Sequence, residues 1–114
     1  MDIRETLTLN KPEELRQWLQ ENHRIKMEIW LVFFRKSSGM QTLTIVQAVE
    51  EALCFGWIQS RLKPLDHGCF AVRFSPRHKG SIWSLPNLNR VRKLIEQGRM
   101  TEDGMDVLPE DFTE

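Results

Sequence analysis

The feature that most constrains the fold is a stretch of alternating and then continuous apolar residues between Ile25 and Phe34. Its odd-numbered positions are all apolar, and charged residues alternate with them as far as Glu28. From Ile29 onward every position is apolar. Alternation with a period of two is typical of a half-buried strand, and a continuous apolar run is typical of a strand covered on both faces. The sequence therefore predicts a strand over 25–34 that starts half-exposed and becomes central in a sheet.

Three helices are predicted from capping residues that are followed by apolar residues at helical spacing. Asn10 and Thr44 each precede, by three residues, a Glu or Gln that completes the pattern of a capping box. Ser84 is well placed as a third N-cap, with a proline in the first turn of its helix. The predicted helices cover 11–22, 44–55 and the stretch from Ser84 to Gly98.

Two further strands, 57–63 and 69–74, are predicted to form a hairpin around the turn 64–68. Residues 75–84 contain helix-breaking Pro and Gly, so we expect a loop there with a short turn around positions 82 and 83. Residues 101–105 are expected to add one further helical turn. The order α-β-α-β-β-α describes an α+β domain, with helices packed on an antiparallel sheet of three or more strands.

The length of 114 residues predicts a single domain, 1–114. The formal net charge is zero, but residues 61–100 hold 9 basic and 2 acidic side chains, whereas 101–114 hold 6 acidic and no basic ones. Residues 101–114 are therefore interpreted as an acidic C-terminal tail. Two alternatives stay open. In the first, the basic segment 61–100 attracts an anion and the acidic tail limits that attraction; in the second, the two segments neutralise each other.

Several classes of protein are disfavoured by the sequence. The longest apolar run has six residues, against about 20 for a membrane-spanning helix, and the N-terminus does not resemble a secretory signal. We therefore expect a cytoplasmic protein with no membrane insertion. Cys54, Cys69 and the 3 histidines lack the spacing of a metal site, so no metal and no cofactor are expected. The sequence leaves the oligomeric state open.

Residues with binding chemistry gather in three junctions between predicted elements, which is where binding sites tend to be built. The guanidinium group of arginine can bind a carboxylate or phosphate through paired hydrogen bonds. Tryptophan rings supply apolar walls, and the backbone N–H groups at the start of a helix favour an anion. The candidate ligand-binding residues are Trp57, Arg73, Arg77, Trp83, Ser84 and Asn87, with Cys54 and Gln59 as candidates for a pocket wall. In the alternative interpretation both tryptophans belong to the core, Arg73 is an exposed strand residue and Arg77 pairs with the acidic tail.

Cys54 needs a separate explanation, because a helical wheel of 44–55 places it in the middle of the polar face. A catalytic thiolate there is disfavoured, since Glu50 lies one turn earlier and would raise the thiol pKa by repulsion between like charges. We expect Cys54 to be a small residue beneath the loop 75–84 or part of a pocket wall.

Four motifs give the chain a resemblance to a known family. They are Glu50-Glu51-Ala52-Leu53-Cys54-Phe55-Gly56-Trp57-Ile58, Arg73-Phe74-Ser75-Pro76-Arg77, Ser81-Ile82-Trp83-Ser84 with Asn87 or Asn89, and Leu94-Ile95-Glu96-Gln97-Gly98-Arg99-Met100 with Gly104. In this order they resemble the YdeI/OmpD-associated family of bacterial proteins over roughly residues 10–112. The resemblance implies a small bacterial protein with a role in protection against bacteriocins, and it supplies no catalytic residues.

The chain departs from that family in three respects. Gln59 stands where an acidic residue commonly follows Gly-Trp-Ile, and Thr44 stands where the family has an aromatic residue. The chain also resembles a short member that lacks the basic, helical C-terminal segment. Any function that needs the missing charge or the missing segment is therefore not implied for this chain.

These observations favour a binding module without catalytic activity, whose ligand is an anionic small molecule or an acidic segment of a partner protein. A nucleic-acid-binding protein regulated by its acidic tail is the first alternative, because the basic middle contains Trp and Phe that could stack on bases. An enzyme of unknown reaction is the second alternative. It ranks below the first because the sequence shows no acid–base pair, metal cluster or phosphate loop.

Overall fold

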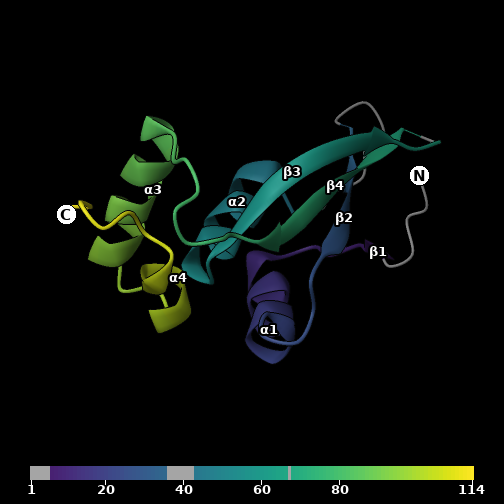
Figure 1. Cartoon of the computed structure of the whole chain (residues 1–114). Helices are drawn as coiled ribbons and strands as arrows, with labels where there is room; N and C mark the ends of the chain where they lie inside the picture. The colour runs from purple at the N-terminus through teal and green to yellow at the C-terminus, as the bar shows by residue number, and fades with distance from the viewer. Residues whose placement is uncertain (1–5, 36–42, 67) are drawn as a thin grey trace.

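A four-stranded sheet in the order β1-β2-β4-β3 extends to one end of the described part of the molecule (Figure 1). The computed structural model describes residues 6–35, 43–66 and 68–114. The strands are β1 (Thr6–Leu7), β2 (Ile29–Phe34), β3 (Trp57–Pro64) and β4 (Cys69–Pro76). β4 pairs antiparallel with β2 and β3, whereas β1 pairs with β2 in parallel. The prediction of a purely antiparallel sheet is therefore wrong: the sheet is mixed, because a strand of two residues joins its edge in parallel.

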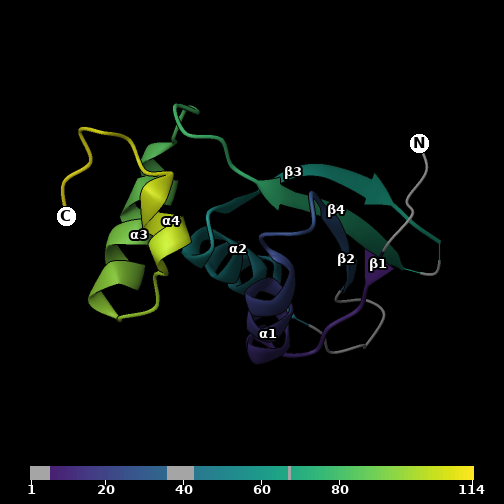
Figure 2. The same ribbon diagram turned by 60° about the horizontal axis from the view of Figure 1, so that its bottom comes forward.

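Within the described ranges, four helices cover one face and one end of this sheet. They are α1 (Pro12–Asn22), α2 (Ile45–Cys54), α3 (Leu85–Glu96) and α4 (Glu102–Asp106). α1 and α2 lie on one face of the sheet, while α3 and α4 form the end of the molecule away from the β3–β4 turn (Figures 1 and 2). The α+β class is confirmed. The observed order contains the predicted α-β-α-β-β-α and adds β1 at the start and α4 at the end.

The helices begin close to where their capping residues predict. Thr44 and Gln47 form a reciprocal capping box before α2, with N···O distances of 3.0 and 3.1 Å. Ser84 caps α3 by accepting a bond from the backbone N–H three residues on. α1 begins one residue later than expected, because Glu14 rather than Glu13 accepts from the backbone ahead of the helix. Local hydrogen bonds of the caps therefore set the helix starts.

Two expectations about chain conformation are wrong. The strand predicted over 25–34 begins only at Ile29, and the residues before it form a turn at 23–25 followed by irregular backbone with a bend at Met27. Ile25 and Met27 are 74% and 71% exposed, so the alternation at these positions does not reflect burial against a layer of the fold. The turn expected around Ile82 lies instead at 79–80. His67, in the predicted turn 64–68, lies outside the described residues.

The core lies between the sheet and the helices. Phe70, Val72 and Phe74 share the face that packs into the core, as predicted for the hairpin. The residues of β2 at positions 29, 31 and 33 join them from the neighbouring strand. Trp57 at the start of β3 is also buried in this core. Arg73 and Ser75 alternate with these residues along β4 and therefore lie on the opposite face of the sheet.

Across the described parts of the chain, none of the helices combines the length and the apolar character needed to cross a membrane.

Candidate functional site

The structure divides the predicted site residues between two cavities rather than one common hollow. The first, the interhelix cavity, has a volume of about 400 Å³ and lies between α2, β3 and α3. The second, the arginine cavity, has a volume of about 370 Å³ and lies where β4 leads into the segment 77–82. Ile58 on β3 lines both cavities. Because successive strand residues point to opposite faces, Trp57 and Gln59 line the first cavity, whereas Ser75, the register partner of Ile58, lines the second.

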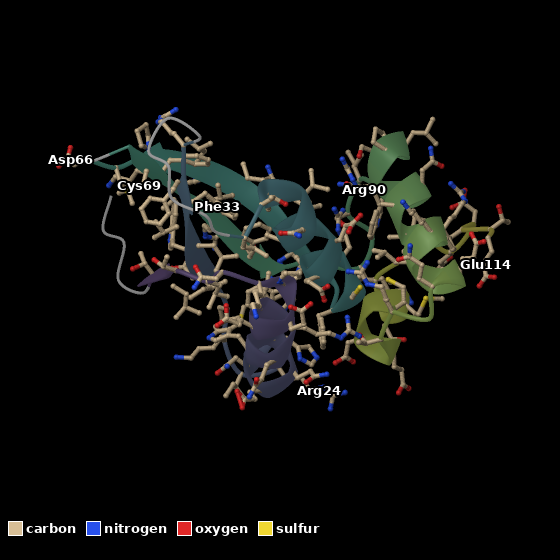
Figure 3. The ribbon with its side chains drawn as sticks, turned by 180° about the vertical axis from the view of Figure 1, so that it is seen from behind. Arg24, Phe33, Asp66, Cys69, Arg90 and Glu114 are labelled. Carbon is tan, nitrogen blue, oxygen red and sulfur yellow. The ribbon has the colours of Figure 1, made fainter. Side chains whose placement is uncertain are left out.

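The interhelix cavity combines an apolar floor with polar residues from α3. Its apolar residues are Ile45, Val46, Val49, Leu53, Trp57 and Ile58. Ser84, Asn87 and Arg90 border it from α3 at intervals of three residues, with Arg90 Nη1 donating to Asn87 Oδ1 at 2.9 Å. Figure 3 shows Arg90 on the side of α3 that faces α2. The spacing of three residues from Ser84 through Asn87 places Arg90 on this side of α3.

The arginine cavity holds Arg73 and Arg77, the two guanidinium groups that the sequence singled out. Arg73 already has a partner of opposite charge, because its Nε lies 2.6 Å from Glu28 Oε1. Its Nη1 also lies 3.3 Å from both Ser60 Oγ and Ser75 Oγ. Glu28, which the sequence did not single out, therefore neutralises Arg73 from the position directly before β2.

Arg77 is the more unusual of the two, because it is buried without a carboxylate partner among the described residues. Only 6% of its surface is exposed. Its Nη1 donates to Ser81 Oγ at 3.2 Å and to Ile82 O at 3.1 Å, while the buried Nε has no hydrogen-bond partner. Burial lowers the pKa of the Arg77 guanidinium, yet arginine keeps its charge at neutral pH. The cavity therefore has one positive charge that no described carboxylate neutralises.

The two candidate tryptophans do not face one another. Trp83 covers the Arg77 guanidinium, whose carbon lies 3.7 Å from the ring centroid, and its Nε1 donates to Val107 O at 3.3 Å. Trp57 is buried and meets Trp18 edge to face, with 5.8 Å between ring centroids. Trp57 therefore belongs to the core and to the floor of one cavity, whereas Trp83 positions the arginine of the other.

Cys54 is fully buried, although the helical wheel places it on the polar side of the helix, and it lines neither cavity as the expected pocket-wall residue would. The same side of α2 carries Glu51, which Arg16 Nη1 and Arg99 Nη2 contact at 3.0 and 2.6 Å. Burial raises the pKa of the Cys54 thiol, and this effect outweighs the opposing influence of Arg16. The chain after Arg99 covers Cys54, since Thr101 Oγ1 donates to its carbonyl oxygen at 2.5 Å. Packing by α1 and by residues 99–101 therefore buries a helix face that looks polar in sequence.

The acidic C-terminal residues do not pair with Arg77. Asp103 Oδ2 lies 2.5 Å from His23 Nε2 and 2.8 Å from Arg24 Nε, at the end of α1. Arg24 and His23 lower the pKa of the Asp103 carboxyl. Within the described ranges, no group of three or more His, Cys, Asp or Glu side chains comes together as metal ligands would.

The fold and these cavities define a small α+β domain. Residues 7–107 match the model of a family described as a domain of unknown function, DUF8412, and the chain belongs to that family. Neither the curated proteins nor the solved structures contain a match to the chain. The relation to the YdeI/OmpD-associated family stays a prediction from the four sequence motifs.

Proposed function

We propose that this domain binds an anionic ligand, a small molecule or an acidic segment of a partner, and that the arginine cavity is the binding site. The observation that carries the proposal is the burial of Arg77 without a carboxylate partner among the described residues. A buried charge costs several kcal/mol unless a partner of opposite charge and hydrogen bonds compensate for it. A bound anion would supply both.

The contacts of Arg77 hold its guanidinium in place ahead of binding. Trp83 covers one face of the group, and Ser81 Oγ together with Ile82 O accepts from Nη1. A cation over an aromatic ring recovers part of the desolvation cost, but the ring supplies no negative charge. Such a preorganised arginine loses less side-chain entropy on binding than a mobile one would.

The remaining candidate residues have separate roles in this proposal. Arg73 stabilises the wall of the arginine cavity through Glu28, and its positive charge is already neutralised there. Trp57, Ser84 and Asn87 border the interhelix cavity, so they contact only a ligand that extends past Ile58. Gln59 also borders the interhelix cavity. Cys54 has no role in binding.

Thermal denaturation with and without anions tests the proposal. Benzoate, inorganic phosphate, phenyl phosphate and a capped hexaglutamate peptide would each be added at increasing concentration to the wild-type domain and to Arg77→Gln. At a concentration one hundred times its Kd, a ligand stabilises the folded state by about 2.7 kcal/mol, which gives a measurable increase in Tm.

We expect at least one anion to raise the Tm of the wild type and to lose that effect in Arg77→Gln. Arg90→Gln is the matched control, because Arg90 borders the other cavity and also lacks a carboxylate partner among the described residues. It should keep the wild-type response. An absence of any shift, or equal shifts in wild type and Arg77→Gln, would contradict the proposal.

A further inference from the structure

The charges that line the arginine cavity limit the charge of its ligand. Two guanidinium groups and the imidazole of His78 line it, and Glu28 neutralises the charge of Arg73 through a contact of 2.6 Å. One guanidinium, that of Arg77, is left without a described counter-charge. A ligand with one negative charge balances this group. A phosphate monoester carries about two negative charges at neutral pH, and its second charge would repel the nearby Glu28.

The free donors of Arg77 favour a carboxylate. Nη1 is occupied by Ser81 Oγ and Ile82 O, whereas the structure gives no acceptor for Nε or Nη2 among the described residues. These two nitrogens lie on one edge of the planar guanidinium. The two oxygens of a carboxylate match such an edge with two parallel hydrogen bonds. Because Trp83 covers one face of the group, a ligand would bind in the plane of the fork.

Two serine hydroxyls add to this recognition. Ser81 Oγ accepts from Arg77 Nη1 at 3.2 Å, and Ser75 Oγ accepts from Arg73 Nη1 at 3.3 Å. A hydroxyl that accepts a bond keeps its own proton for donation. Both serines line the cavity, so both can donate to an oxygen of the ligand.

The rim of the cavity is apolar, which points to a ligand with an apolar body. Met27 and Ile82 line the cavity although they are 71% and 93% exposed, and Ile58 forms the wall between them and the interhelix cavity. Single exposed apolar side chains are common at protein surfaces. Here, however, they border a cavity of about 370 Å³, the size of a small-molecule site. An apolar group bound there would cover both side chains.

We infer that the ligand is a small monocarboxylic acid whose carboxylate binds the Nε–Nη2 edge of Arg77 and whose apolar body contacts Met27, Ile58 and Ile82. This inference rests on the proposed function and names the chemical class of the ligand. Nε is shielded from solvent, so binding also requires a small shift of the atoms that cover it. Shifts of side chains on binding are common in protein complexes.

An NMR titration of the ¹⁵N-labelled domain tests the inference with three probes that share one ring. The probes are benzoate, phenyl phosphate and benzamide, which differ only in the charge and shape of the group attached to the ring. The Nε–H resonance of Arg77, assigned by its loss in Arg77→Lys, reports on the donor directly. We expect benzoate to shift this resonance and to bind at least about tenfold more tightly than either other probe, as charged hydrogen bonds allow.

Three variants separate the contributions. Arg77→Lys keeps the charge but removes the fork, so we expect a loss of about tenfold or more in benzoate affinity. Ile82→Gln, at a side chain too exposed to matter for folding, should weaken benzoate several-fold and leave acetate unchanged. Arg90→Gln should bind benzoate as the wild type does. If Arg77→Lys does not fold, Ile82→Gln still tests the apolar contact.

The outcomes distinguish this inference from the function on which it rests. Phenyl phosphate or a capped hexaglutamate peptide could bind more tightly than benzoate and still need Arg77. In that case the assignment of the ligand as a monocarboxylate is wrong, and the proposed anion-binding function is retained. Equal affinities for benzoate and benzamide would also overturn the assignment of the ligand as a monocarboxylate. If no anion shifts the Arg77 Nε–H resonance, both the ligand class and the proposed function fall.

Discussion

Two charged residues are buried among the described residues, and only one of them has partners of opposite charge. Glu51 is 5% exposed and is held between Arg16 and Arg99. Arg77 has hydrogen bonds to a hydroxyl and a carbonyl, but no carboxylate. A fully paired buried charge is a structural feature, whereas an unpaired one is a strong indication of a binding site. This contrast is the reason for placing the ligand at Arg77 and not at α2.

Replacing Glu51 with alanine is expected to destabilise the domain by about 2–3 kcal/mol, because it leaves two partly buried arginines without their acceptor. Urea denaturation followed by circular dichroism measures the free energy of unfolding. Glu50→Ala is the control, since Glu50 lies 3.6 Å from Arg99 and is more exposed; it should cost less than about 1 kcal/mol. Equal unfolding free energies for the two variants would show that the Glu51 contacts contribute little.

At the scale of elements, ion pairs of Asp103 link the end of α1 to α4. His23, the C-cap of α1, lies 2.6 Å from Leu19 O through Nδ1 and 2.5 Å from Asp103 Oδ2 through Nε2. Arg24 contacts the same carboxylate oxygen. The contacts of Arg24 and His23 lower the pKa of Asp103, so the folded domain holds this carboxylate in its charged form more strongly than the unfolded chain does.

The stability that Asp103 contributes should therefore be complete above its ordinary pKa of 3.8 and should disappear as pH falls through its lower folded value. Unfolding free energies of the wild type and Asp103→Asn, measured between pH 6 and pH 2.5, test this. We expect the variant to be less stable at pH 6 and the difference to shrink below about pH 3.8. A difference that stays constant over the whole range would contradict the ion pair.

Local signals predicted most elements, and non-local contacts account for the rest. Thr44 and Ser84 cap their helices through bonds to residues three positions away, so the sequence nearby contains the whole signal. β1 has only two residues, and it forms because the backbone of β2 pairs with it, which no local pattern indicates. Cys54 and Glu51 are buried through contacts with Arg16, Arg99 and Thr101, which the local helical pattern does not indicate.

The candidate site was predictable only in part. Arg73, Arg77 and the nearby serines could be singled out because they end or follow one strand. The sequence did not show that strand β3 separates their cavity from that of Trp57 and Asn87. Nor could it show that Glu28 pairs with Arg73 and leaves Arg77 unpaired, since that choice depends on how the segment directly before β2 packs.

At the scale of the whole molecule, the acidic C-terminal residues belong to the folded domain. Leu108 is 7% exposed and joins the hydrophobic core, and Phe112 packs against it. Gly104 lies so close to α2 that a Cβ there would be 2.3 Å from Cys54 O. These contacts make residues 101–112 part of the packing of α2, in addition to the negative charge that they contribute.

Leu108→Ala is accordingly expected to lower the free energy of unfolding by about 2–3 kcal/mol, as other large-to-small substitutions in protein cores do. Leu85→Ala is the matched control, because Leu85 is 65% exposed and its truncation should cost less than about 0.5 kcal/mol. Thermal or urea unfolding measures the free energy of unfolding of both variants. Similar stabilities of the two variants would mean that the C-terminal residues are a separate appendage.

The position of β3 at the edge of the described sheet affects how these molecules behave at high concentration. An edge strand offers its outer backbone groups to a strand of a neighbouring molecule, which is a common route to aggregation. Here the register with β4 shifts between Gln59 and Leu62, and the strand continues through Arg61 and Lys63 to Pro64. Irregular pairing, basic side chains and a proline are features that prevent such strand addition. The edge strand β3, which lies next to both cavities, is therefore protected from pairing with strands of other molecules. The domain can thus keep this edge accessible to small solutes.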